Sequence, residues 1–191
     1  MDNLLNRAKE EISYLGNGII KADSFINHQL YPNLITEMGT RFAELFKEAK
    51  VTNITRVVTA EVSGIAPAFA VAQVLNVPMV FARKKRPATM VDKLFEGEAP
   101  SHTKGGVVKL FVSSQYLKST DQVLLIDDFL ATGYTVKAMV DLIAQSGATL
   151  CGVGCVIEKV FEDGRNYLRD LNVPIITLVK IDLQGEVLSV F

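Results

Sequence analysis

The sequence has no apolar run of the ~18 residues that a membrane-spanning helix needs. Its first residues, MDNLLNRAKEEISYL, alternate charged and apolar side chains and lack the apolar core of a signal peptide. The phosphate-binding glycine motifs GxGxxG and GxxxxGK[ST] are both missing, and there is no internal repeat or low-complexity stretch. We therefore expect a cytoplasmic protein without a membrane partner.

Cysteine is scarce, with Cys151 and Cys155 in the apolar run ATLCGVGCVI. If this run is a strand, the two lie on one face about 13 Å apart. That is too far for a disulfide, which needs Cα atoms within ~7 Å. No histidine or third cysteine is near, so we expect two buried thiols in a reducing compartment rather than a metal site.

Charge is nearly balanced but unevenly distributed. The 191 residues carry a net charge of −1 and are 49% hydrophobic, which predicts a single domain over 1–191 with a sizeable core. Residues 83–118 contain eight Lys or Arg and three acids, so this segment is +5 and the remainder is −6. Such a segment indicates a local anionic ligand, although a solvated basic loop would have the same composition. The run 83–86 lacks the extended basic face and interleaved aromatics of a nucleic-acid site, so no nucleic-acid partner is expected.

Strand and helix patterns alternate along the chain. Mostly apolar runs predict strands at 54–60, 78–83, 107–113, 123–127, 149–158 and 174–181. Helical patterns lie at 2–14, 32–49, 68–76, 134–146 and 165–171. Residues 84–105 contain prolines and glycines with weak periodicity and predict a long loop. Continuous apolar strands alternating with helices predict an α/β fold with a doubly wound, mainly parallel sheet.

In such sheets, ligands bind beyond the carboxyl ends of the strands. Three predicted loops lie there, at 61–66, 83–106 and 127–135. The third follows VLLI with two adjacent carboxylates, Asp127 and Asp128, and then the turn ATGYT opens a helix. Backbone N–H groups at a helix start make a phosphate cradle. The carboxylates suit sugar hydroxyls or a Mg²⁺ ion shared with a polyphosphate. Simple strand-end caps and an ordinary turn would explain this arrangement less well.

This motif resembles the signature of the type I phosphoribosyltransferases, enzymes that use phosphoribosyl pyrophosphate (PRPP). The resemblance covers nearly the whole chain and extends to bacterial xanthine-using members of the purine branch. It is carried by KADSFINHQ (21–29), SGIAPA (63–68), VFARK (80–84), LIDDFLATG (125–133) and VIEK (156–159). It implies transfer of the phosphoribosyl group from PRPP to xanthine, with Mg²⁺, in a homodimer.

The resemblance also implies roles for individual residues. Asp127 and Asp128 would bind the ribose hydroxyls, and either could contact the metal. The phosphate groups would meet two loops and two cations: Ala131, Thr132, Gly133, Tyr134 and Thr135 at the 5′-phosphate; Glu61, Val62, Ser63 and Gly64 at the pyrophosphate, often with a non-proline cis peptide; and Arg83 and Lys84 beside them. The purine would meet Ile20, Asn27, Phe129 and Lys159.

Two further segments have implied roles. Residues 1–30 would form an N-terminal helix and a purine-pocket segment, and 84–106 a flexible hood that closes over the reaction. Taken without the resemblance, Ile20 would be a core residue, Asn27 a turn residue and Lys159 a solvated charge. Some purine members carry an aspartate at the position of Ala131, where it can take up the N7 proton of the purine. This chain therefore has no assigned general base.

Two other functions fit parts of the pattern. One is a hypoxanthine-guanine or adenine phosphoribosyltransferase, which a panel of purines would distinguish. The other is a PRPP-sensing regulator, which would carry an N-terminal DNA-binding domain. Only about 50 residues, with few basic side chains, precede the first predicted sheet strand, and this favours the enzyme.

Overall fold

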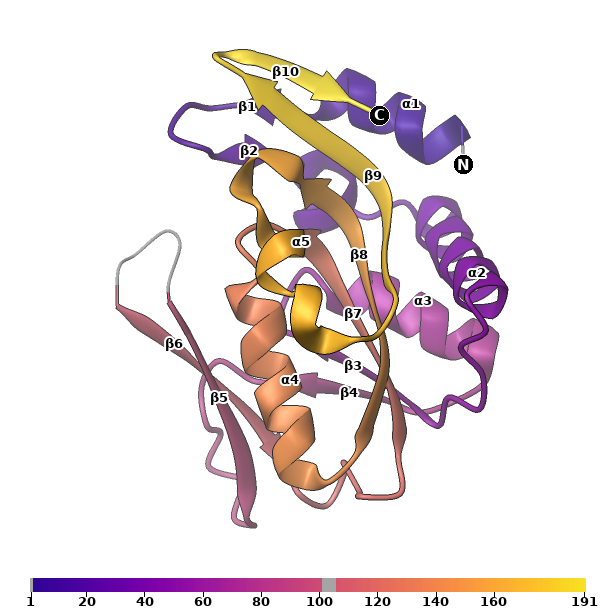
Figure 1. Ribbon diagram of the computed structural model, residues 1–191, viewed down its shortest axis with the longest axis vertical. Helices are drawn as coiled ribbons and strands as arrows, with labels where there is room; N and C mark the ends of the chain where they lie inside the picture. Colours follow the sequence, from indigo (N-terminus) through magenta and orange to yellow (C-terminus); the bar gives the residue numbers. More distant parts are fainter. Residues whose placement is uncertain (1, 101–105) are drawn as a thin grey trace.

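A six-stranded sheet forms the middle layer of the computed structural model, which describes residues 2–100 and 106–191 (Figure 1). The strand order is β10-β9-β8-β7-β3-β4, and all neighbours are parallel except β10 and β9. The strands are β3 (Arg56–Ala60), β4 (Met79–Ala82), β7 (Gln122–Leu130), β8 (Thr149–Lys159), β9 (Ile175–Gln184) and β10 (Val187–Val190). The predicted doubly wound, mainly parallel sheet is confirmed.

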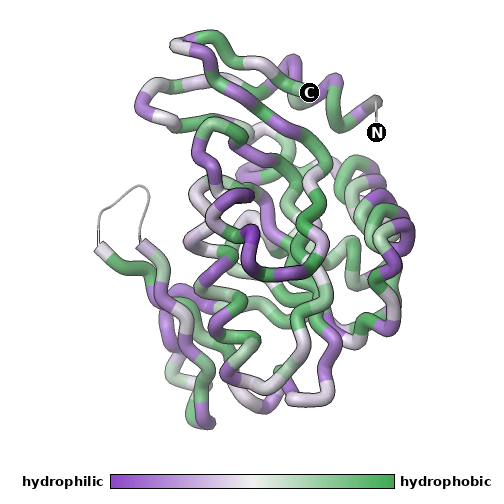
Figure 2. Tube along the Cα trace, viewed as in Figure 1, coloured by the Kyte–Doolittle hydropathy of each residue, from purple (hydrophilic) through white to green (hydrophobic). Residues whose placement is uncertain are grey.

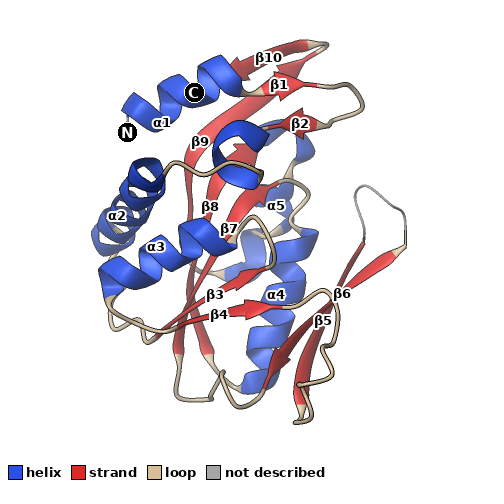
Figure 3. Ribbon diagram, turned by 180° about the vertical axis from the view of Figure 1, so that it is seen from behind, coloured by secondary structure: helices blue, strands red, loops and turns tan. Residues whose placement is uncertain are grey.

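Helices cover both faces of this sheet, α4 and α5 on one and α2 and α3 on the other (Figures 1 and 3). Their bounds are α1 (Asp2–Glu11), α2 (Pro32–Glu48), α3 (Ile65–Leu75), α4 (Tyr134–Ser146) and α5 (Gly164–Tyr167). Short 3-10 turns lie at Val160–Glu162 and Arg169–Leu171. In the described part of the chain, no helix is long and apolar enough to cross a membrane.

The core has two halves, one on each face of the sheet. Figure 2 shows the apolar segments gathered in the central strands. Val123, Leu124, Leu125 and Ile126 of β7 are all at most 1% exposed, because helices cover both of their faces. This burial is the physical reason that the strand reads as a continuous apolar run rather than an alternating one.

The N-terminal segment differs from its prediction. The first helix ends at Glu11 rather than Tyr14, because Ser13 and Tyr14 form β1 and pair with Lys21 and Ile20 of β2 (Ile20–Lys21). Leu15 is 61% exposed in the turn between these strands. A π-helix (Asp23–Asn27) follows and inserts Phe25 and Ile26 into the core.

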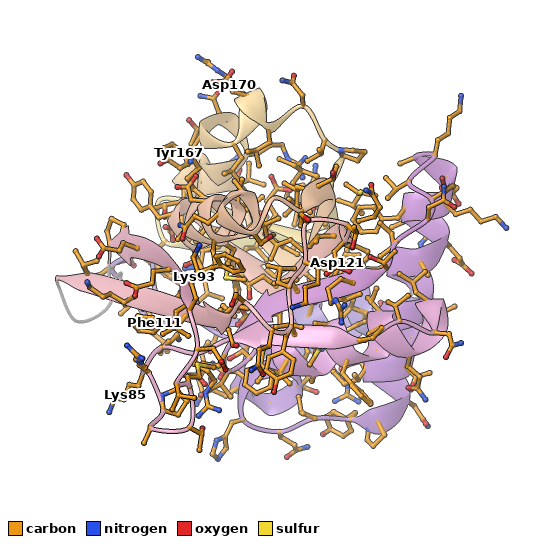
Figure 4. All side chains as sticks on the ribbon, turned by 90° about the horizontal axis from the view of Figure 1, so that it is seen from below. Lys85, Lys93, Phe111, Asp121, Tyr167 and Asp170 are labelled. Carbon is orange, nitrogen blue, oxygen red and sulfur yellow. The ribbon has the colours of Figure 1, made fainter. Side chains whose placement is uncertain are left out.

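The predicted loop at 84–105 is wrong for residues 94–100, which form β5 (Leu94–Pro100) in an antiparallel hairpin with β6 (Val107–Ser113). Burial alternates along β5, with Phe95, Gly97 and Ala99 inward. Figure 4 shows Lys85, Lys93 and Phe111 together on the side formed by the hairpin and the segment leading into it. Residues 101–105, which belong to the predicted hood, lie outside the described residues.

Close packing joins this hairpin to α4. A Cβ atom on Gly97 would lie 2.3 Å from the backbone oxygen of Ala138. Alanine normally stabilises a strand relative to glycine by about 0.5–1 kcal/mol. We predict the opposite here, because overpacking costs about 1–3 kcal/mol: Gly97→Ala should lower the free energy of unfolding in urea titrations.

The matched control for this prediction is Glu98→Ala on the solvent side of the same strand, where the side chain is 57% exposed. It should change the free energy of unfolding by less than about 0.5 kcal/mol. A Gly97→Ala protein as stable as the parent would show that the hairpin does not depend on this contact.

Candidate active site

The site lies where β3 and β7 separate. Their parallel pairing runs from Arg56 and Val123 to Val58 and Leu125 and ends there, although both strands continue. After β3 the chain crosses to β4 on one side, and after β7 it crosses to β8 on the other. This reversal of direction is the topological switch point, where α/β sheets bind ligands.

A turn with features of a phosphate cradle follows β7. Gly133 has φ = 84°, a left-handed conformation that favours glycine, and α4 begins at the next residue. The first N–H groups of a helix have no acceptor within the helix, so those of α4 are available for an anion.

The turn is packed from behind by α5. A Cβ atom on Gly164 would lie 2.0 Å from the backbone oxygen of Ala131, so only glycine allows this approach. The next residue, Arg165, donates two hydrogen bonds to Glu158, at 2.7 and 2.6 Å. Thr177 also donates to Glu158, at 2.8 Å. Burial favours a higher pKa for Glu158, but the hydrogen bonds from Arg165 and Thr177 prevail and lower this pKa below its ordinary value.

The two carboxylates near the carboxyl end of β7, which continues to Leu130 beyond the predicted strand end at 127, differ in environment. Asp127 is 6% exposed and accepts a hydrogen bond from the N–H of Asp128 at 3.0 Å. Asp128 is half-buried. Burial raises the pKa of Asp127 well above its ordinary value, and the adjacent charge of Asp128 raises it further. The carboxylate pair therefore favours a bound cation or hydroxyl donors.

The loop after β3 contacts both the carboxylates and the basic segment. Its Glu61–Val62 peptide bond is cis. A Cβ atom on Gly64 would lie 2.6 Å from a carboxylate oxygen of Asp127. The Glu61 carboxylate accepts a hydrogen bond from the N–H of Lys84 at 2.6 Å and pairs with Arg83 at 2.8 Å. The loop is thus held against the end of β4.

At the other end of the site, the N-terminal segment meets the end of β8. The Lys159 ammonium donates to the backbone oxygen of Gly18 at 3.0 Å and to Glu162 at 2.9 Å. It also lies 5.8 Å from the ring centroid of Phe129. Asn27 accepts a hydrogen bond from Ser63 at 2.8 Å, which links the π-helix to the loop after β3.

A cavity of about 380 Å³ joins these parts. Of the residues predicted for the site, it is lined by Ile20, Asn27, Glu61, Val62, Ser63, Gly64, Lys84, Asp127, Asp128, Phe129, Ala131, Thr132, Gly133, Tyr134, Thr135 and Lys159. Arg83 is not among its lining residues: it pairs with Glu61, and its backbone bonds to Phe111. Residues from segments far apart in sequence thus share one cavity.

Sequence reasoning missed one wall. Ala99 and Pro100 of β5 and Val108 and Leu110 of β6 also line the cavity. The sequence feature that could have predicted β5 is the alternation of inward and outward residues in LFEGEAP. This alternation is weak because two of the inward residues, Gly97 and Ala99, are small.

Over the described ranges, no group of three or more His, Cys, Asp or Glu residues could hold a metal ion by itself. The two cavity carboxylates nevertheless fit Mg²⁺, which typically takes one or two protein carboxylates and completes its coordination with water and substrate phosphates. The residues present suit a metal that arrives with a phosphate ligand.

A doubly wound α/β fold with a phosphate cradle and carboxylates at its switch point defines a protein that binds a phosphorylated ligand. The family model described as "Phosphoribosyl transferase domain" matches residues 28–184. The chain belongs to this family.

Two relatives named xanthine phosphoribosyltransferase illustrate the similarity. One from Deinococcus deserti is 52% identical over 186 residues, which cover 97% of this chain and 95% of the relative. One from Streptococcus agalactiae is 44% identical over 181 residues, which cover 95% and 92%.

Solved structures share the fold. Adenine phosphoribosyltransferase from Thermoanaerobacter pseudethanolicus has a TM-score of 0.75 at 23% identity, covering 92% of this chain and 99% of its own. The enzyme from Saccharomyces cerevisiae has a TM-score of 0.75 at 24% identity, covering 93% and 99%. These structures support the fold alone.

The environment of Asp127 predicts a pH-dependent effect on stability. Its pKa is raised in the folded protein, so above the unfolded value of about 3.9 the unfolded chain releases this proton more readily. Stability from this group is therefore lost as pH rises toward the folded pKa. Asp127→Asn removes that loss, and its melting temperature relative to the parent should increase with pH by up to about 3–5 °C per pH unit.

Differential scanning calorimetry of both ligand-free proteins from pH 4, near the unfolded pKa, up to pH 8 measures this difference. A difference in melting temperature that is constant across this range would contradict a raised pKa for Asp127 in the folded protein.

Proposed function

We propose that this protein transfers the phosphoribosyl group of PRPP to xanthine, giving xanthosine 5′-monophosphate and pyrophosphate in purine salvage. The observation that carries the proposal is the single cavity lined by the phosphate cradle at 131–135, the two carboxylates and the loop at 61–64. The names of the relatives at 44–52% identity support the choice of xanthine.

In this proposal, the phosphate cradle and the carboxylates fix the ribose. The N–H groups at the start of α4 bind the 5′-phosphate, and Asp127 and Asp128 accept hydrogen bonds from the ribose hydroxyls. A purine nitrogen then displaces pyrophosphate at C1′, and positive charge develops on the sugar ring. The carboxylates stabilise this charge, so the site works mainly by positioning and electrostatics.

The pyrophosphate lies against the loop at 61–64 with Lys84 beside it, and Arg83, which is outside the cavity lining, supports this loop through its pair with Glu61. When bound, Mg²⁺ neutralises negative charge on the leaving pyrophosphate. Asp127 or Asp128 would contact this ion. Residues 84–106 act as a hood that excludes water, which would otherwise hydrolyse PRPP.

Lys159 recognises the 6-oxo group of the purine. Two of its three N–H donors are directed to Gly18 and Glu162, which holds the ammonium at the cavity edge. The third donates to the 6-oxo oxygen, while Ile20 and Phe129 contact the ring. An ammonium only donates hydrogen bonds, so it cannot pair with the 6-amino group of adenine.

Proton transfer needs no aspartate at position 131 in this proposal. Xanthine is an acidic purine and enters the site already ionised, so the protein holds an anion instead of removing a proton. The small side chain of Ala131 is compatible with this role, because it leaves room for the backbone to approach the phosphate.

We also propose a cytoplasmic homodimer. Ile65, Phe69 and Gln73 share one face of α3 by their four-residue spacing, and Phe69 is 59% exposed. Val62, in the loop before this helix, is 67% exposed. A second copy that covers this face would bury the apolar side chains beside the proposed pyrophosphate loop.

A panel of purines tests the function. With PRPP and Mg²⁺, we expect the fastest nucleotide formation from xanthine, slower formation from guanine and hypoxanthine, and none detectable from adenine. Sites that pair one buried polar group reject a mismatched analogue by up to ~10⁴–10⁵-fold. Lys159→Ala should weaken oxopurine binding, whereas Lys47→Ala, at an exposed position on α2, should not. Efficient use of adenine by the parent would contradict the role of Lys159.

The carboxylates should matter for turnover more than for folding. We predict that the double variant Asp127→Asn, Asp128→Asn folds and loses at least ~10²-fold in kcat with saturating substrates. Circular dichroism provides the folding control. Near-normal turnover by this variant would remove both residues from the proposed mechanism.

A further inference from the structure

The β5–β6 hairpin is hydrogen-bonded on both of its outer edges at the same level. Glu96 of β5 stands opposite Phe111 of β6. The backbone N–H and C=O of Phe111 point away from β5 and bond to the backbone of Arg83, both at 2.9 Å. In an antiparallel ladder, the residue opposite then also directs its backbone groups outward. Those of Glu96 therefore face α4, which lies alongside the hairpin (Figure 1).

Gln145, near the end of α4, supplies partners for both of these groups. The N–H of Glu96 donates to the side-chain oxygen of Gln145 at 3.0 Å, and the NH₂ group of Gln145 donates to the backbone oxygen of Glu96 at 2.6 Å. A backbone N–H only donates and a carbonyl oxygen only accepts, so both bonds form in a single orientation of the amide. The side chain thus takes the place of a neighbouring strand along this edge of the hairpin.

This contact adjoins the part of the hairpin that lines the cavity. The lining begins at Ala99, three residues after Glu96. Between them, Gly97 packs so closely on α4 that a Cβ atom would lie 2.3 Å from the backbone oxygen of Ala138. The hairpin is therefore fixed to α4 immediately before its cavity-facing residues.

The helix α4 connects this wall to the phosphate cradle. The cradle at 131–135 includes the first residues of α4, and Gln145 is its penultimate residue. The wall and the cradle consequently share one rigid support. A hairpin released from α4 would move relative to the ligand that the cradle holds.

We propose that Gln145 is a positioning residue for the reaction: its amide fixes the hairpin to α4, so that the wall beginning at Ala99 excludes water from C1′ of bound PRPP. This inference rests on the proposed function, and Gln145 is not among the residues that line the cavity. Water that reaches C1′ in place of the purine forms the new C1′–O bond, displaces pyrophosphate and leaves ribose 5-phosphate. A displaced wall therefore favours hydrolysis over transfer.

The test is the ratio of two rates at saturating PRPP and Mg²⁺: pyrophosphate release without purine, and nucleotide formation with xanthine. Gln145→Met keeps most of the side-chain bulk but has no N–H donor and only a weak acceptor. The ratio should rise about two- to tenfold, as expected for the loss of a hydrogen bond. Gln115→Ala, at an exposed position in the turn after β6, is the control and should keep the ratio of the parent.

Hydrogen exchange in the ligand-free protein reports the anchor without catalysis. The amide of Glu96 should exchange about two- to tenfold faster in Gln145→Met than in the parent, because its hydrogen bond is lost. Unchanged exchange would overturn the inference, since the hairpin would then be held by packing alone.

The ratio also separates positioning from general damage. A smaller amount of folded protein lowers both rates equally and leaves their ratio unchanged. Faster exchange with the ratio of the parent would make Gln145 a structural anchor only and overturn the inference. If the parent forms no nucleotide from any purine, the proposed function fails and this inference fails with it. Faster exchange together with a higher ratio in Gln145→Met, and neither in Gln115→Ala, supports the inference.

Discussion

The separation of β3 and β7 beyond Val58 and Leu125 is the constraint on which the rest of the site depends. If the two strands stayed paired to their ends, their backbones would close the gap that Asp127 and the loop at 61–64 occupy. The opposite directions of the two crossovers keep the gap open, because each following helix packs on a different face of the sheet. The order of the strands and the direction of their crossovers therefore determine where the site lies, and the side chains determine what it can bind.

This gap contains a buried carboxylate that the empty protein stabilises poorly. Asp127 lies beside Asp128 and beneath Gly64, where burial and the neighbouring charge both favour protonation. A ligand with hydroxyl donors or a divalent cation would stabilise the charged form of Asp127. The ligand-free protein is therefore less stable than it would be without this buried carboxylate, and binding offsets that cost, which is common at functional sites.

Much of this arrangement could be predicted from sequence. The strands at 123–127 and 149–158 are continuous apolar runs because helices cover both of their faces, and the turn at 131–135 has its own local chemistry. The strand β5 was not predicted because its inward residues Gly97 and Ala99 add little apolar bulk to the sequence pattern. The contact of Lys159 with Gly18 and the Ser63–Asn27 bond could not be predicted because they arise only when distant segments meet.

The packing of α5 behind the phosphate cradle also has a consequence for modularity. The segment 123–135 contains the whole recognisable motif, yet the turn rests on Gly164, which the Glu158–Arg165 pair anchors to β8. Transfer of residues 123–135 to another sheet would reproduce the sequence of the motif but not the packing of Gly164 against the turn. The proposed phosphate cradle therefore depends on residues that are not contiguous in sequence, and these reach at least to Thr177.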